Sequence, residues 1–177
     1  SEFVPTAGSP ATKHFTNLNG NTVTSNVVTE AVGAPLSVMP SLYAAPAMTN
    51  LALHSNDMTQ AQWAKTNMTA AFNAVGLTGA PNTGSTLTAT AGNATSIQTV
   101  TAASGSHTAR FFLRRKTGTG TVEITVDNIT WTTVALTTAY QAFSVNATVT
   151  NPQVGIRIVT SGDAVEVGNG ECYLKTI

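Results

Sequence analysis

The residues of this sequence that could do chemistry are few and scattered. Two of its eight acidic side chains, Glu123 and Asp127, share one face of a predicted strand. Four residues at about 3.3 Å each place them roughly 13 Å apart, whereas a glycosidase needs two carboxylates about 5–9.5 Å apart. The other acidic candidates are Asp57, Asp163, Glu166 and Glu171. We expect structural or solvated roles for all of them, and no catalytic pair.

Nucleophilic and metal-assisted catalysis have no better support. The histidines His14, His54 and His107 are far apart in the sequence, and we expect each at the surface or at a loop edge. No Gly-x-Ser-x-Gly elbow surrounds a serine, and no paired-cysteine or His-x-x-x-His spacing occurs. Residues 118–120, Gly-Thr-Gly, lack the lysine of a phosphate-binding loop, so we interpret them as a hairpin turn. The sequence therefore predicts a protein that is not an enzyme and needs no cofactor.

Composition narrows the range of partners. Eight Lys+Arg balance eight Asp+Glu, so the basic surplus that a general nucleic-acid binder needs is missing. No run reaches the 18 or so apolar residues of a membrane span. We therefore expect neither nucleic acid nor membrane as a partner. The single cysteine, Cys172, excludes an intrachain disulfide, and we expect it to be buried in the last strand.

The chain of 177 residues divides by composition into two parts. Residues 1–46 are rich in proline and contain one predicted strand, 22–28, so we interpret them as an extended arm or linker that packs on something else, such as another subunit. Residues 47–177 form the predicted domain. There we expect a first strand at 50–54, a capped helical turn from 55–59 to Trp63, and, at most, one short helix at 69–74.

Apolar and polar residues alternate at period two in the rest of this domain, which is typical of strands with one face in a core. The predicted strands cover residues 63–68, 85–90, 96–100, 108–116, 122–127, 140–149, 154–159 and 164–167. Short strands with turn signals at about 8–12-residue spacing predict an all-β, antiparallel β-sandwich or barrel.

The alternation also assigns faces. Ala109, Phe111 and Leu113 share one face of their strand, and the apolar residues of 122–126, 143–147 and 154–158 alternate in the same way, so we assign these faces to the core. If these strands are neighbours, the outer face carries Arg110, Phe112, Arg114 and Arg157 beside Glu123, Thr125, Gly155 and Asp127.

An aromatic ring flanked by guanidinium groups and carboxylates suits a sugar, because the ring stacks on the apolar face of a pyranose and arginine donates to its hydroxyls. The candidate carbohydrate-binding residues are Phe112, Arg114, Arg110 and Arg157, with Trp131 and Tyr140 at the rim. Two alternatives remain open. The arginines pair with Glu123 and Asp127 across strands, or the aromatic rings serve packing alone.

Three segments carry a family resemblance. Residues 50–67 contain Asn-Leu, then Ser and Asp, then Trp-x-Lys; 118–127 are followed by Thr130-Trp131; and 151–165 run from Asn-Pro to Asp-Ala-Val. Together they resemble a module of tailed-bacteriophage virion proteins, within a wider group similar to jelly-roll carbohydrate-binding modules. The resemblance covers about residues 49–177 and implies a jelly roll. That group often has an acidic pair late in the final strand, where a structural calcium binds. This chain reads Val-Gly-Asn-Gly-Glu at 167–171, which does not support a calcium site.

The resemblance implies a non-catalytic module of a virion (a tail fibre, head fibre or decoration protein) that binds cell-surface glycan. Its partners would be glycan, other virion proteins and further copies of itself. Two alternatives stay open: a structural capsid or tail decoration protein that binds only virion proteins, and the binding module of a larger depolymerase.

Overall fold

The computed structural model describes residues 13–16, 22–25 and 49–174. The chain divides into two compact units, residues 1–45 and 46–177. In the first unit, β1 (Lys13–Thr16) pairs antiparallel with β2 (Thr22–Ser25). The arm was predicted to contain one strand, at 22–28, so β1 is an addition; His14 lies in it.

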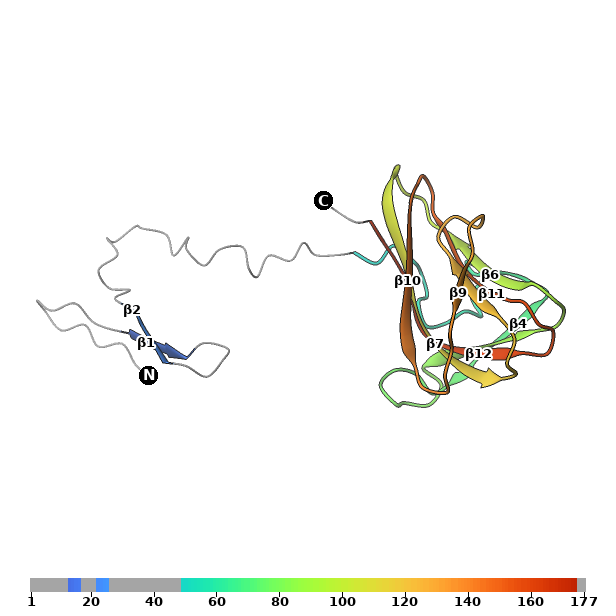
Figure 1. Ribbon diagram of the computed structural model, residues 1–177, viewed down its shortest axis with the longest axis horizontal. Coiled ribbons are helices and arrows are strands. Elements are labelled where there is room, and N and C mark those ends of the chain that lie inside the picture. Colours follow the sequence, from blue (N-terminus) through green and yellow to red (C-terminus); the bar gives the residue numbers. More distant parts are fainter. Residues whose placement is uncertain (1–12, 17–21, 26–48, 175–177) are drawn as a thin grey trace, which may run out of the picture. The chain divides into compact units, whose positions relative to one another are not determined.

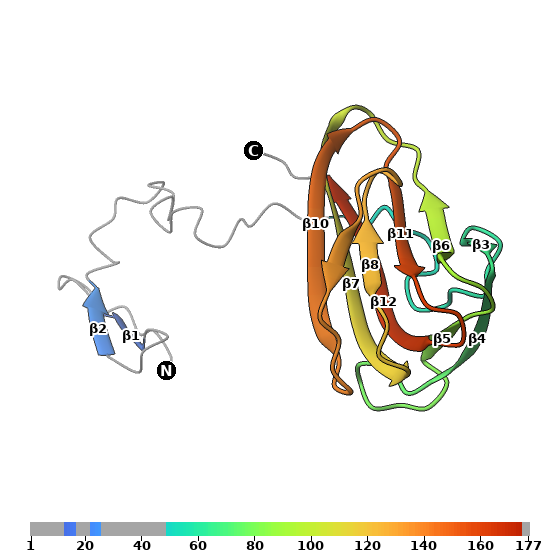
Figure 2. The same ribbon diagram turned by 45° about the vertical axis from the view of Figure 1, so that its right-hand side comes forward.

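The second unit is a sandwich of two five-stranded antiparallel sheets, which face each other in Figures 1 and 2. Sheet I has the order β10 (Gln141–Val149), β7 (Gly105–Thr117), β12 (Ala164–Leu174), β5 (Gly84–Ala89) and β4 (Met68–Ala74). Sheet II has the order β3 (Ala64–Thr66), β6 (Ala94–Thr99), β11 (Gln153–Ile158), β8 (Val122–Thr125) and β9 (Thr132–Val134). The residues that the structure describes include no helix. The predicted all-β, antiparallel sandwich of jelly-roll type is confirmed.

No membrane-spanning helix is found in the described part of the chain.

The core lies between the sheets, and the alternation along β7 shows why. Ala109, Phe111 and Leu113 are fully buried, whereas Arg110 and Phe112 lie on the other face and are partly exposed. Because successive side chains of a strand point to opposite faces, one strand supplies both a core wall and an outer surface. The predicted face assignment of this strand is confirmed.

In sheet II, the apolar residues of β8 and β11 are buried as predicted: Val122, Ile124, Val154, Ile156 and Ile158. Two residues predicted to be exposed there are buried. Thr125 is fully buried, and its hydroxyl donates to the Asp127 carboxylate and accepts from the Asn128 amide. Gly155 is covered by Ile97, whose Cγ1 would lie 2.8 Å from a Cβ at that position.

The interpretation of residues 118–120 as a hairpin turn is wrong. β7 belongs to sheet I and β8 to sheet II, so this segment carries the chain from one sheet to the other. Asp163 holds the crossing, because its Oδ2 accepts from the Gly120 amide at 2.7 Å and from Arg115 Nη1 at 3.3 Å. The segment joins the two strands predicted on either side of it, but those strands do not pair with each other.

The predictions for the start of the domain need correction. Residues 50–54 form no strand, because the Asn50 side chain turns the backbone: its Oδ1 accepts from the amides of Ala52 and Cys172. Turns replace the helical turn expected after residue 55. Residues 69–74, where a short helix was considered, belong to edge strand β4, which pairs with β5.

Two other single-residue predictions are settled by burial. Cys172 is fully buried in β12, as predicted. His54 is exposed, whereas His107 is fully buried in β7 and its Nδ1 lies 3.0 Å from the Gly105 carbonyl oxygen. The surface position predicted for His107 is therefore wrong.

Candidate functional site

The six predicted sugar-binding residues do not form one surface. Arg110, Phe112 and Arg114 lie on the outer face of sheet I, and Tyr140 immediately precedes β10 of that sheet. Arg157 belongs to β11 of sheet II. The premise that all these strands are neighbours is wrong, and Arg157 lies on the opposite side of the sandwich from Phe112.

On the outer face of sheet I, two guanidinium groups lie over two aromatic rings. The Arg110 guanidinium carbon is 4.6 Å from the centroid of Phe112, and that of Arg114 is 4.5 Å from the centroid of Tyr140. Contacts of this kind are attractive because the ring face is electron-rich. They also restrict both long side chains, so their remaining N–H groups are held along one line of the sheet.

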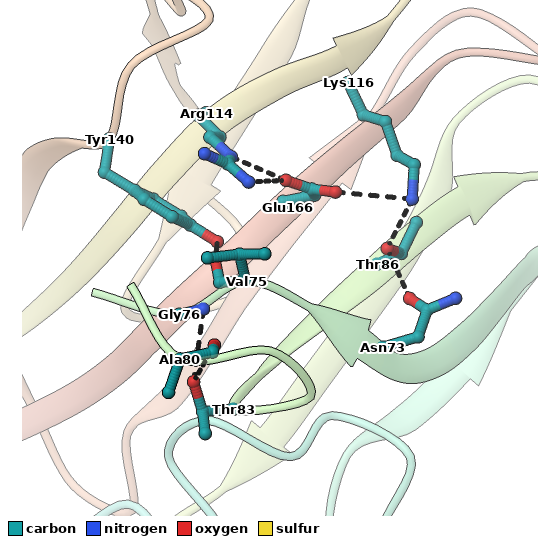
Figure 3. Close-up of polar contacts among 10 residues, drawn as sticks. All are labelled: Asn73, Val75, Gly76, Ala80, Thr83, Thr86, Arg114, Lys116, Tyr140 and Glu166. Atoms are coloured by element: carbon teal, nitrogen blue, oxygen red, sulfur yellow. Dashed lines mark hydrogen bonds and ion pairs between the residues drawn. The ribbon is translucent and has the colours of Figure 1, made fainter. Parts of the chain in front are cut away.

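A polar network crosses the sheet beside these rings (Figure 3). Arg114 Nε donates to Glu166 Oε2 at 2.5 Å, and Lys116 Nζ lies 3.3 Å from Glu166 Oε1. Lys116 also donates to the Thr86 hydroxyl, which donates to Asn73 Oδ1. The network therefore joins β7, β12, β5 and β4. The arginine partners predicted for this strand, Glu123 and Asp127, lie in and after β8 of sheet II, so Glu166 takes that role.

The loop between β4 and β5 borders this surface. The Tyr140 hydroxyl donates to the Val75 carbonyl at 2.9 Å, which fixes the ring against the loop (Figure 3). Leu77 packs over Gly168, where a Cβ would lie 2.8 Å from the leucine side chain and 3.2 Å from Tyr140. Gly168 lies at the bulge of β12, where the register to β7 shifts between Val167 and Asn169. Val75 and Leu77 are both exposed and give this border an apolar surface.

Burial and charge change the pKa of Tyr140. Burial raises it most, the Arg114 guanidinium lowers it, and the Glu166 carboxylate raises it again; the net pKa is raised. The hydroxyl therefore stays protonated and remains a donor at neutral pH.

The centre of the face holds a second polar group that sequence reasoning missed. Glu171 is paired directly with Arg110, and Asn169 with Phe112, across β12 and β7. Asn169 Nδ2 donates to Glu171 Oε1 at 2.7 Å. Burial and then Glu171 raise the pKa of the adjacent Tyr173 to about 12, while Arg110 partly offsets the rise. Only the pairing of the final strand with β7, about 60 residues earlier, brings these side chains together, and no local pattern signals it.

Sheet II carries the remaining two predicted residues. The Arg157 guanidinium carbon lies 4.4 Å from the ring centroid of Trp131, and Arg157 Nε donates to Glu123 Oε2 at 2.5 Å. The cross-strand pairing of an arginine with Glu123 is therefore present, through Arg157. Trp131 is partly exposed, in the loop before β9.

The chemistry of these surfaces is that of hydrogen bonding and stacking. Both oxygens of Glu166 are occupied by contacts with cations, Oε2 with Arg114 and Oε1 with Lys116. Within residues 13–16, 22–25 and 49–174, no group of three or more His, Cys, Asp and Glu side chains is arranged to hold a metal ion. Each surface instead presents rings, guanidinium groups and amides along a sheet face.

Solved structures share this architecture. A variant of a family 29 carbohydrate-binding module aligns with 71% of this chain and 89% of its own, at 13% identity and a TM-score of 0.50. An α-L-arabinofuranosidase bound to arabinose aligns with 66% of this chain and 24% of its own, at 12% identity and a TM-score of 0.50. The enzymatically active domain of tailspike protein 4 of bacteriophage CBA120 aligns over 71% of this chain and 21% of its own, at 12% identity and a TM-score of 0.48.

The chain has the fold of a jelly-roll module. At these identities the likeness concerns the fold alone. No protein-family model matches the sequence, and no curated protein matches it.

Proposed function

We propose that this chain is a non-catalytic carbohydrate-binding module, and that the outer face of sheet I is its binding surface. The proposal is based on one arrangement: Arg110, Phe112 and Arg114 lie in a line on one face of β7, and Tyr140 lies beside them. Rings supply apolar faces for pyranoses, and guanidinium groups supply several donors in fixed directions.

The fold supports this proposal. The jelly-roll neighbours at a TM-score of 0.50 include carbohydrate-binding modules in which ligand recognition was probed, one of them in complex with cellulohexaose. The similarity to these structures supports the sheet architecture of the proposed site, whereas its chemistry is inferred from the side chains of this chain. Sugar binding by such a face needs no metal and no acid–base pair.

The polar network also supports the proposal, because its charged side chains are already paired and held in place before a ligand binds. Arg114, Glu166 and Lys116 hold one another, so little side-chain freedom is lost when a sugar hydroxyl joins them. Arg110 takes part in no ion pair among the described residues, and its donors are available to a ligand.

We further propose that the module belongs to a tailed-bacteriophage virion and recognises glycan on a cell surface. The support is the sequence resemblance of residues 50–67, 118–127 and 151–165 to virion modules. Residues 1–46 would attach the module to other virion proteins or to further copies of itself. Several copies acting together would raise the avidity for a repeating polysaccharide.

A printed glycan array probed with the full chain tests the proposal. Binding to at least one glycan is expected, and Phe112→Ala should weaken it by about tenfold or more, because the site loses its stacked ring. Leu53→Ala, which removes an exposed leucine outside the strands of both sheets, is the matched control and should bind normally. A folded wild-type chain that binds no glycan, while residues 1–46 are needed for incorporation into virions, would favour the structural decoration protein instead.

A further inference from the structure

The same three-residue arrangement occurs twice in this molecule. On sheet I, Arg114 Nε donates to Glu166 Oε2 at 2.5 Å, and its guanidinium lies 4.5 Å from the Tyr140 ring. On sheet II, Arg157 Nε donates to Glu123 Oε2 at 2.5 Å, and its guanidinium lies 4.4 Å from the Trp131 ring. We call these arrangements triad I and triad II.

The two triads also agree in exposure. The arginine side chains are 26% and 27% exposed, and the glutamate side chains are 12% and 14% exposed. In each triad the carboxylate holds the guanidinium over a ring, at the solvent-facing side of its sheet. The chemistry proposed for sheet I, stacking plus a fixed set of donors, is therefore present on sheet II as well.

Triad II keeps more of its hydrogen-bonding capacity than triad I. Glu166 uses both carboxylate oxygens for Arg114 and Lys116. Among the described residues, Glu123 accepts only from Arg157, through Oε2, and its Oε1 accepts no hydrogen bond. A donor and an acceptor that lie side by side near a ring suit a sugar hydroxyl, which can accept from Arg157 and donate to Glu123.

The loop that carries Trp131 is held in place before any ligand binds. Asp127 Oδ1 accepts from the Ile129 amide at 2.9 Å, from the Thr130 amide at 2.7 Å and from the Thr125 hydroxyl at 2.9 Å. Thr125 is itself fully buried, so the loop is anchored in the core. A ring on a fixed loop loses little freedom on binding, which favours affinity.

We infer that Trp131, Arg157 and Glu123 form a second glycan-binding site, on the face of the sandwich opposite to the first. The inference rests on the proposed function, since it assigns the same class of ligand, a pyranose chain. One module then holds two glycan chains, one against each sheet.

Binding at the second site can be measured separately from binding at the first, because the two tryptophans of the chain differ in burial. Of these, Trp63 is fully buried and Trp131 is partly exposed. A change in tryptophan fluorescence on adding a sugar therefore reports on triad II. Isothermal titration calorimetry on the same samples counts the sites per chain.

The experiment titrates the full chain with cellohexaose and with the oligosaccharide that gives the strongest array signal. We expect two sites per chain for the wild type, one for Phe112→Ala, one for Trp131→Ala, and none for the double variant. Phe112→Ala should retain the fluorescence change. Trp131→Phe, which keeps a ring under the guanidinium, should retain two sites with an affinity within about tenfold of wild type.

Controls separate loss of binding from loss of fold. Each variant should keep the wild-type far-ultraviolet circular dichroism, and Phe72→Ala, which removes another exposed aromatic side chain, should keep the second site. One site in the wild type, or unchanged stoichiometry in Trp131→Ala, would overturn the second site and leave the proposed function standing. A wild-type chain that binds no glycan would overturn both.

Discussion

The rings of Trp63 and Phe111 meet edge to face in the core, with centroids 6.3 Å apart and planes at 61°. Both side chains are fully buried, one from the segment before β3 and one from β7. The Trp63 indole N–H donates to the carbonyls of Leu53 and His54. This contact fastens the irregular start of the domain to the middle of the sandwich, in place of the predicted strand and helical turn.

Truncation of the two adjacent phenylalanines of β7 should lower the free energy of unfolding by very different amounts. Phe111→Ala leaves a cavity beside Trp63 and should lower the free energy of unfolding by about 3–5 kcal/mol. Phe112→Ala removes a partly exposed ring and should cost less than about 1 kcal/mol. Urea denaturation followed by tryptophan fluorescence measures both. Equal losses for the two variants would contradict the face assignment on which the binding surface depends.

Lys65 stabilises the same region through its ammonium group. Its Nζ lies 2.7 Å from the Trp63 carbonyl oxygen, and between 2.9 and 3.3 Å from those of Met58, Thr59 and Gln60. Lys65→Met keeps the aliphatic stem but leaves these acceptors without their donor. It should lower the free energy of unfolding by about 2 kcal/mol, because hydrogen bonds to charged groups are the stronger kind.

Lys116→Met is the matched control for that measurement. Its side chain is 39% exposed, and its partner Glu166 keeps the hydrogen bond from Arg114 when the ammonium is removed, so the loss should be less than about 1 kcal/mol. If Lys65→Met is no more destabilising than this control, the ammonium does not organise the 58–63 segment.

Alanine substitutions at Gly118 and Gly162 should distinguish the cost of backbone strain from the cost of steric overlap. Both have positive φ, +81° and +84°. A Cβ at Gly162 would meet nothing within 4 Å, whereas a Cβ at Gly118 would overlap the Asp163 carboxylate that holds the crossing between the sheets. Gly162→Ala should therefore cost about 1 kcal/mol, from the backbone alone. Gly118→Ala should cost clearly more, as measured by thermal unfolding; the reverse order would show that the crossing adapts to a side chain.

The loop before Trp131 should show a defined pH dependence. Burial raises the pKa of Asp127, but the hydrogen bonds from Ile129, Thr130 and Thr125 outweigh it, so the pKa lies below the ordinary value of 3.8. The stabilisation by this carboxylate is therefore complete above about pH 4 and is lost as the pH falls through the lower pKa of the folded state.

Asp127→Asn tests this dependence. It should be about 1 kcal/mol less stable than wild type at pH 7, and the difference should shrink below pH 4. Unfolding curves at several pH values measure it. A difference that is constant down to pH 2 would mean that the charge of Asp127 plays no part.

The thiol of Cys172 should be unreactive in the folded chain. Burial raises its pKa to about 11, and the side chain is fully buried. At pH 8 we expect negligible reaction with a disulfide reagent such as DTNB, and rapid reaction in concentrated urea, because the thiolate is the reactive form. Rapid labelling without denaturant would show that β12 opens readily.

The period-two pattern predicted the faces of the strands but not their neighbours. Along 108–116 and 154–158, alternation alone placed Phe111 and Ile156 inside and Phe112 and Arg157 outside, and the structure agrees. Alternation carries no information on which sheet a strand joins. Arg157 was therefore grouped with Phe112, although β11 and β7 lie in different layers.

The other differences between the predicted and the observed structure each have a specific cause. β4 has an alanine-rich sequence with a good intrinsic helix propensity, and its pairing with β5 at the sheet edge decides its conformation. β9 has only three residues, too few for a period to be visible. Thr125 follows the outward parity of its strand in sequence, but its hydroxyl is used inside to hold Asp127. Glu166, Asn169 and Glu171 reach the site only through the long-range pairing of β12.

The position of β12 has a consequence for how the sandwich folds. This strand lies in the middle of sheet I, between β7 and β5. Until it is available, those two strands lack their shared neighbour and present unpaired backbone edges. Folding of the sandwich is therefore expected only once β12 has paired with both strands, and chains in which it has not yet paired are the most prone to aggregation.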